Sequence, residues 1–148
     1  MKFRTSLAAI GAAVVLGTTG ALVVPAVASA HSSTQTLKFI SVQKKSVVFT
    51  KSSGGQQDTD VNAAGKTVGF DMLYFAFVSA TTGNVNATID TAGGFLYGTL
   101  TYNVKTGAIT NGKVTGGTGA FAGATGTIKA KNLNKSGTRT AVTITYSG

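Results

Sequence analysis

One glycine-rich stretch has the spacing of a phosphate-binding loop. Residues 117–122 read Gly-Thr-Gly-Ala-Phe-Ala, which fits the GxGxxG/A pattern that places a dinucleotide pyrophosphate on a helix N-terminus. That chemistry needs a helix directly after the glycines and an acidic residue about twenty positions later. Residues 126–131 instead alternate as a strand, and no acidic residue follows Asp90. We therefore interpret the stretch as a glycine-rich bend between two strands, with Phe121 as a packing plug.

Acid–base chemistry has few candidates, because the chain has four aspartates and no glutamate. Asp71 lies in the otherwise apolar run VGFDMLYFAF. If Asp71 faces a lumen, desolvation raises its pKa and it could act as an acid or an orienting group. The alternative is an aspartate near a strand end, exposed or bonded to backbone amides. Tyr74, Tyr97 and Tyr102 are further candidates, with Tyr146, for hydroxyls in a cavity, although tyrosines in β-rich chains more often pack or form interfaces.

Metal sites are not supported by the remaining polar residues. Asp58, Asp60 and Asn62 have the spacing of a calcium loop, but the glycine and the bidentate glutamate that such a loop needs are missing. We expect Asp58 and Asp60 to form a solvated strand start. His31 is the only histidine and there is no cysteine, so neither a zinc site nor a Ser–His relay can be assembled. The expectation is no metal and no cofactor.

Residues 1–30 have the features of a secretory signal peptide. Two basic residues precede a long uncharged run that ends Ala28-Ser29-Ala30, which is the order of a basic region, an apolar region and a small-residue cleavage site. We expect cleavage between Ala30 and His31 and a secreted domain of residues 31–148 without a membrane segment. A retained anchor is the alternative, weakened by the polar residues and proline within the run.

The elements that must position these residues are strands. Glycine-containing turn signals recur at fairly even spacing, and the segments between them are rich in Val, Ile, Thr, Phe and Tyr, which indicates an all-β sandwich or barrel. We expect one domain with about eight strands, the first of which could be broken near Lys44. Their predicted ranges are 37–49, 58–62, 66–80, 85–91, 95–104, 108–115, 125–134 and 138–146.

The segment 66–80 is apolar on both faces. Leu73, Phe75 and Phe77 share one face, and Phe70, Met72, Tyr74 and Val78 share the other. A strand that is apolar on both faces is normally buried on both. We therefore expect a loop or a neighbouring subunit, in a dimer or trimer, to cover the outer face.

The charge is strongly basic, with 13 lysines and arginines and a formal net charge of +9. These residues are scattered, Lys44-Lys45 is the only adjacent pair, and no aromatic residues interleave the stripe Lys129, Lys131 and Lys135. A nucleic-acid platform would need clustered charge with stacking rings. We expect no specific nucleic-acid binding, and a solvated face or weak contact with anionic cell-wall polymer instead.

Residues 112–131, GKVTGGTGAFAGATGTIKAK, closely resemble the GGTGxFxxAxG signature of dirigent proteins and allene oxide cyclase-like barrels. The segments GKTVGFDMLYFAF and TAVTITYSG resemble strands of the same family. The resemblance covers most of residues 37–148, is specific over 112–131, and suggests a bacterial, secreted member. The matching signature positions are Gly116, Gly117, Thr118, Gly119, Phe121, Ala124 and Gly126.

The resemblance implies an antiparallel eight-stranded barrel whose lumen holds an apolar molecule. Dirigent relatives form trimers and steer the coupling of phenoxy radicals, and allene oxide cyclases close a ring in a fatty-acid epoxide. Both act by confining one reactive conformer. The plant cyclases use glutamate and cysteine near the substrate, and this chain has neither, so no catalytic residue is transferred. The relatives also suggest a second interpretation of Asp58 and Asp60, as a pair at the lumen mouth.

The sequence therefore predicts a secreted, allene oxide cyclase/dirigent-like barrel that binds an apolar small molecule and directs its cyclisation or coupling by confinement. The alternative is a non-catalytic secreted surface or cell-wall-associated scaffold or binding protein. Whether the barrel is an enzyme is left open; as an enzyme it would be a cyclase or a coupling guide without a cofactor. The two hypotheses differ at the lumen, because a filled interior would contradict the first.

Overall fold

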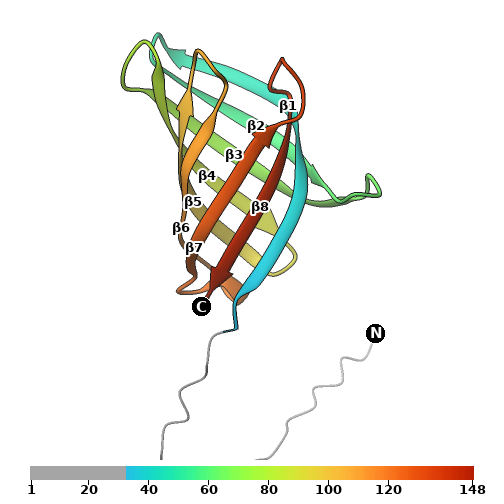
Figure 1. The fold of residues 1–148 in the computed structure, drawn as a ribbon. Coiled ribbons are helices and arrows are strands. Elements are labelled where there is room, and N and C mark those ends of the chain that lie inside the picture. The colour runs from blue at the N-terminus through green and yellow to red at the C-terminus, as the bar shows by residue number, and fades with distance from the viewer. Residues whose placement is uncertain (1–32) are drawn as a thin grey trace, which may run out of the picture. The chain divides into compact units, whose positions relative to one another are not determined.

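The computed structural model describes residues 33–148, so the predicted signal peptide and its cleavage site at Ala30 and His31 lie outside the described residues. The described chain forms a closed barrel of eight antiparallel strands, in which each strand pairs with its sequence neighbour and β8 pairs with β1. This confirms the predicted all-β, antiparallel eight-stranded barrel (Figure 1). The strands are β1 (Gln35–Thr50), β2 (Ser53–Val61), β3 (Thr67–Phe77), β4 (Thr82–Thr91), β5 (Gly94–Asn103), β6 (Ile109–Gly117), β7 (Thr125–Asn132) and β8 (Arg139–Ser147).

Side chains alternate between the interior and the exterior of the barrel along each strand. In β7 and β8, Ile128 and Ile144 are paired and buried in the core, whereas the neighbouring pair Lys129 and Thr143 lies on the outer side. Successive strand side chains point to opposite faces, so one face of every strand is directed inward once the sheet closes. No helical segment within residues 33–148 has the length and apolar character needed to cross a bilayer.

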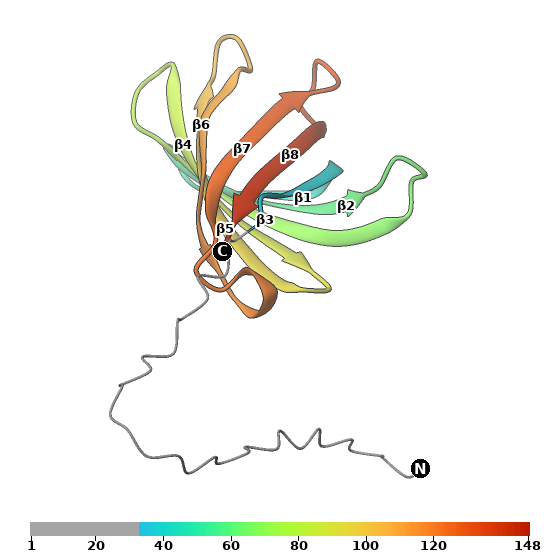
Figure 2. The same cartoon turned by 60° about the horizontal axis from the view of Figure 1, so that its bottom comes forward.

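One end of the barrel is closed by the glycine-rich connection between β6 and β7, which contains a short 3₁₀ turn, η1 (Gly119–Phe121). Phe121 is only 4% exposed and packs edge-to-face on Tyr146, with 5.3 Å between ring centroids. Thr118 fixes the connection to β5, because its Oγ1 accepts from the Phe95 amide at 3.0 Å. Figures 1 and 2 show this connection at the same end of the barrel as the C-terminus.

Two glycines of the connection are required by its geometry. Gly119 has φ +59°, which favours glycine, and a Cβ there would collide with the carbonyl oxygen of Gly93. A Cβ on Gly117 would overlap both Phe121 and the backbone of Phe95. The stretch therefore serves close packing between strands.

The first hairpin differs from its prediction. The second strand was predicted over 58–62, after a turn at the glycines, but β2 begins at Ser53, and Gly54 and Gly55 pair with β1. The ring of Phe49 lies so close to Gly55 that a Cβ there would be 2.9 Å from Phe49 Cζ. Glycine at this position thus admits an aromatic ring and does not end the strand. β1 also runs unbroken through Lys44, with only a register shift beside it.

The outer face of β3 is open to solvent in the single chain. Phe70, Met72 and Tyr74 are 48%, 59% and 44% exposed. The expectation that this strand is buried on both faces is therefore wrong for the isolated chain, because no described loop covers it. Its cover by a second subunit stays a prediction.

Candidate functional site

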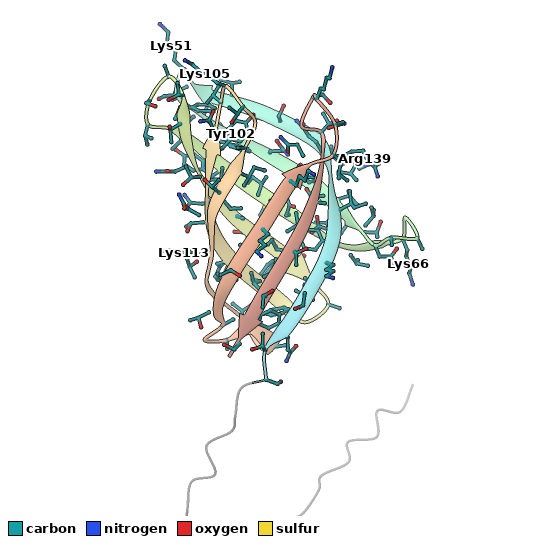
Figure 3. All side chains as sticks on the ribbon, in the orientation of Figure 1. Lys51, Lys66, Tyr102, Lys105, Lys113 and Arg139 are labelled. Carbon is teal, nitrogen blue, oxygen red and sulfur yellow. The ribbon has the colours of Figure 1, made fainter. Side chains whose placement is uncertain are left out.

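The lumen contains an apolar cavity of about 480 Å³, which falls within the usual size range of small-molecule sites. Its walls include Phe39, Leu73, Phe75, Val85, Leu100 and Val142. Lys51 in the β1–β2 turn and Gly137 in the β7–β8 turn also line the cavity, so its mouth lies at the end of the barrel where these turns meet. Figure 3 places Lys51, Lys105 and Tyr102 together at that end.

Three carboxyl groups occupy the interior beneath these walls. Asp58, Asp60 and Asp71 are 2%, 1% and 4% exposed. Asp58 lies directly opposite Asp71 in the β2–β3 ladder, and Asp60 lies opposite Ser41 of β1 and Gly69 of β3. Asp58 and Asp71 line the cavity. The alternation along β2 accounts for this arrangement, because residues 56, 58 and 60 point inward while their neighbours point outward.

The hydrogen bonds around these carboxyls are concentrated on one oxygen atom. Ser41 Oγ donates to Asp58 Oδ2 at 2.6 Å, and Gln56 Nε2 donates to the same oxygen at 2.7 Å. Within residues 33–148, no hydroxyl, amide or ammonium donor reaches Asp58 Oδ1, Asp71 Oδ1 or either oxygen of Asp60. Buried acceptors without donors are uncommon in folded proteins. Two of these acceptors belong to residues that line the cavity, so a ligand could supply the missing donors.

Burial raises the pKa of all three carboxyls. The pKa of Asp60 rises to about 8, first through desolvation and then through the charges and hydrogen bonding of Asp71 and the charge of Asp58. The pKa of Asp71 rises to about 6, first through desolvation and then through the charge of Asp58, and the nearby Ser41 hydroxyl and Asp60 carboxyl oppose part of the rise. Desolvation also raises the pKa of Asp58, and its bonds to Ser41 and Gln56 oppose the rise.

These shifts favour the protonated form of Asp60 at neutral pH. Asp60 and Asp71 affect each other's ionisation, so the two titrate as a unit. Such a pair contains both a proton donor and a proton acceptor. It lies at the base of an apolar cavity, where acid–base or orienting chemistry would be strengthened by the low polarity.

The predicted site residues divide between the two sides of the barrel wall. Asp71 lies in the lumen, and Tyr102 is half-buried and lines the cavity. Tyr74 and Tyr97 were expected to be candidates for lumen hydroxyls, but they lie on the outer side and are 44% and 37% exposed. They belong to strand faces opposite to the inward residues, so that assignment is wrong.

Of the two interpretations of Asp58 and Asp60, the solvated strand start is wrong, since both are buried inside the barrel. The other, a pair at the lumen mouth, had them on the lumen side of the barrel wall. Ser41 and Gln56, which donate to Asp58, were not expected from the sequence to be parts of a site. The signal was present, because Gln56, Asp58 and Asp60 alternate with period two along one strand. It was obscured by the assumption that the glycines before Gln56 form a turn.

The signature residues lie at the end of β6, in the connection that follows it, and in β7. Gly116 and Gly117 end β6, Thr118 to Ala124 form the closed-end connection, and Gly126 lies in β7 beside β8. Among residues 33–148, no group of three or more His, Cys, Asp or Glu side chains is arranged to hold a metal ion.

No family model and no curated protein matches the chain. The resemblance to dirigent and allene oxide cyclase-like barrels therefore stays a prediction.

Proposed function

We propose that the chain is an allene oxide cyclase/dirigent-like barrel that binds an apolar small molecule in its lumen and directs its cyclisation or coupling by confinement. The observation that supports this most is the open apolar cavity of about 480 Å³ above three buried carboxyls. Apolar walls would restrict the ligand to few conformers and exclude water. The Asp60–Asp71 pair would orient a polar group of the ligand or exchange a proton with it.

A second candidate function is a secreted, cell-wall-associated binding protein without catalysis. Three of the four aspartates lie inside the barrel, so its outer surface carries eleven exposed Lys and Arg side chains and one exposed carboxylate, Asp90. A surface of nearly one charge sign attracts anionic polymers. A basic outer surface does not exclude ligand binding in the lumen. The two functions are therefore distinguished by measuring whether the lumen binds a ligand.

Lumen binding can be tested with a matched pair of alanine substitutions. Ala130 on β7 lines the cavity, whereas Ala141 on β8 alternates away from it and pairs with Lys131 on the outer side. Titration of residues 31–148 with the neutral fluorophore N-phenylnaphthylamine measures apolar binding. We expect Ala130→Leu to weaken binding at least about fivefold, because the added methylenes fill the cavity. Ala141→Leu serves as the control and should bind as the parent does.

Two results would count against the proposal. The first is no fluorophore binding by the parent protein. The second is an equal effect of both substitutions, which would place binding outside the lumen. The outer groove of about 410 Å³ beside Phe49, Met72 and Tyr74 is the competing location. Native mass spectrometry of the protein from its own culture would report the co-purifying ligand and the subunit number.

A further inference from the structure

The lumen has charge of only one sign. Among the described residues, every Lys and Arg side chain is exposed, and only Lys51, in the turn at the mouth, touches the cavity. Asp58, Asp60 and Asp71 provide all the charged groups of the interior. Buried carboxylates without a cation nearby are unfavourable, because each must be paired or neutralised. Desolvation and the neighbouring aspartates raise the pKa of Asp60 to about 8, which favours its neutral form.

Two carboxyl oxygens of cavity-lining residues lack a donor from the described chain. The donors of Ser41 and Gln56 both serve Asp58 Oδ2. Asp58 Oδ1 and Asp71 Oδ1 have no donor from the described chain, and both residues line the cavity from directly opposed positions in the ladder. These are buried, unpartnered acceptors at an apolar cavity, so the complementary ligand group is a compact donor.

The chemistry of the acceptors discriminates between ligand groups. A protonated amine brings three N–H donors and a positive charge. A hydroxyl brings one donor and no charge, and a carboxylate would add a further negative charge to the interior. The described side chains include no group of three or more His, Cys, Asp or Glu arranged to hold a metal ion. An organic ammonium group on an apolar body satisfies both the carboxyls and the walls.

We propose that the lumen is selective for amphiphilic amines, whose ammonium group binds between Asp58 and Asp71 while the apolar body lies against the walls toward the mouth. The inference rests on lumen binding as the proposed function and names the ligand class. Hydrogen bonds to charged partners are roughly twice as strong as neutral ones. An amine should therefore bind at least about tenfold more tightly than the alcohol of the same skeleton.

The test uses three ligands that share one carbon skeleton: phenylbutylamine, phenylbutanol and phenylbutyrate. Isothermal titration of residues 31–148 near neutral pH should give the order amine, alcohol, carboxylate. Asp58→Asn and Asp71→Asn should each reduce the preference for amine over alcohol at least about fivefold, because each removes one carboxylate. Asp90→Asn is the matched control, since Asp90 is the exposed aspartate on the outer face, and it should keep the preference.

Some results would overturn amine selectivity alone, and others would also overturn lumen binding. Equal binding of all three ligands, tighter binding of alcohol or carboxylate, or an amine preference that survives both lumen substitutions would overturn amine selectivity and leave lumen binding intact. If neither these ligands nor N-phenylnaphthylamine bind, the proposed function fails as well. The two asparagine variants are independent tests, so misfolding of one, detected by its melting curve, leaves the other decisive. If both misfold, weaker amine binding by Ala130→Leu than by Ala141→Leu supports the lumen site, and equal amine binding by these two variants overturns it.

Discussion

The buried carboxyls predict that the protein becomes less stable as pH rises from about 4.5 to 8. The pKa of Asp60 is about 8 in the folded chain, against an ordinary value of 3.8. Between these values the folded state holds a proton that the unfolded chain has released. The stabilisation is therefore fully present below pH 3.8 and is lost as pH rises through 8. Asp71, with a folded pKa of about 6, acts in the same direction over the lower part of the window.

The magnitude follows from proton linkage. One proton held only by the folded state lowers the free energy of unfolding by about 1.4 kcal/mol for each pH unit. Between about pH 4.5 and 8 the unscreened effect of Asp60 is about 5 kcal/mol, and solvent screening reduces it to roughly 3 kcal/mol. For a domain of this size that corresponds to a fall of roughly 10 °C in Tm.

The assay is thermal unfolding of residues 31–148 followed by circular dichroism at closely spaced pH values and constant ionic strength. The chain suits this test because it has no glutamate and one histidine, so few other side chains titrate in the window. Asp60→Asn should flatten the profile and raise Tm at pH 8, because the amide removes the titrating group and the like-charge repulsion. Asp90→Asn should leave the slope unchanged.

A Tm that stays constant or rises between pH 4.5 and 8 would refute the reasoning. The same slope in the parent and in Asp60→Asn would show that the titration comes from other groups. Either result would mean that the carboxyls of the lumen are hydrated and ionised, and the cavity would then be far more polar than the structure indicates.

Two further predictions concern the closed end and the carboxyl network. Phe121→Ala should lower the free energy of unfolding by about 3–4 kcal/mol in urea titrations, since it removes a buried ring. Phe95→Ala, at a 40% exposed site, should lower the free energy of unfolding far less. Equal losses in the two variants would contradict the role of Phe121 in packing the closed end. Ser41→Ala should raise the pKa of Asp58, because the 2.6 Å bond from Ser41 stabilises its charged form; carboxyl-carbon NMR titration would show this, and an unchanged or lowered pKa would contradict it.

The fold was largely predictable because its determinants are local. In β7 and β8, the alternation of Ile128 with Lys129 and of Ile144 with Thr143 marks inner and outer faces without tertiary information. The bend around Phe121 was also readable, since the residues after it alternate as a strand and exclude a phosphate loop. Glycines were less informative. The same residue type forms a bend at Gly119 and continues a strand at Gly55, and only the position of the Phe49 ring distinguishes them.

The site was less predictable because it depends on strand register. The alternation of Asp58 and Asp60 shows that they share a face, but not that this face is the lumen. That follows only from pairing, which sets Asp58 opposite Asp71 and Asp60 opposite Ser41. The same limit applies to β3, where one apolar face lines the cavity and the other, including Met72, is exposed. A strand that is apolar on both faces does not reveal which side is the interior.

The placement of the aspartates bears on the choice between a scaffold and a binding protein. Three of the four carboxyls of the chain lie together in the lumen, where desolvation and mutual repulsion make them destabilising at neutral pH. Replacing buried charged groups by apolar residues of similar volume is often neutral or stabilising. A barrel that serves only as a scaffold would therefore gain stability by losing Asp60 and Asp71. Retention of perturbed carboxyls beside an open cavity is typical of functional sites, and this argues for a lumen that acts on a ligand.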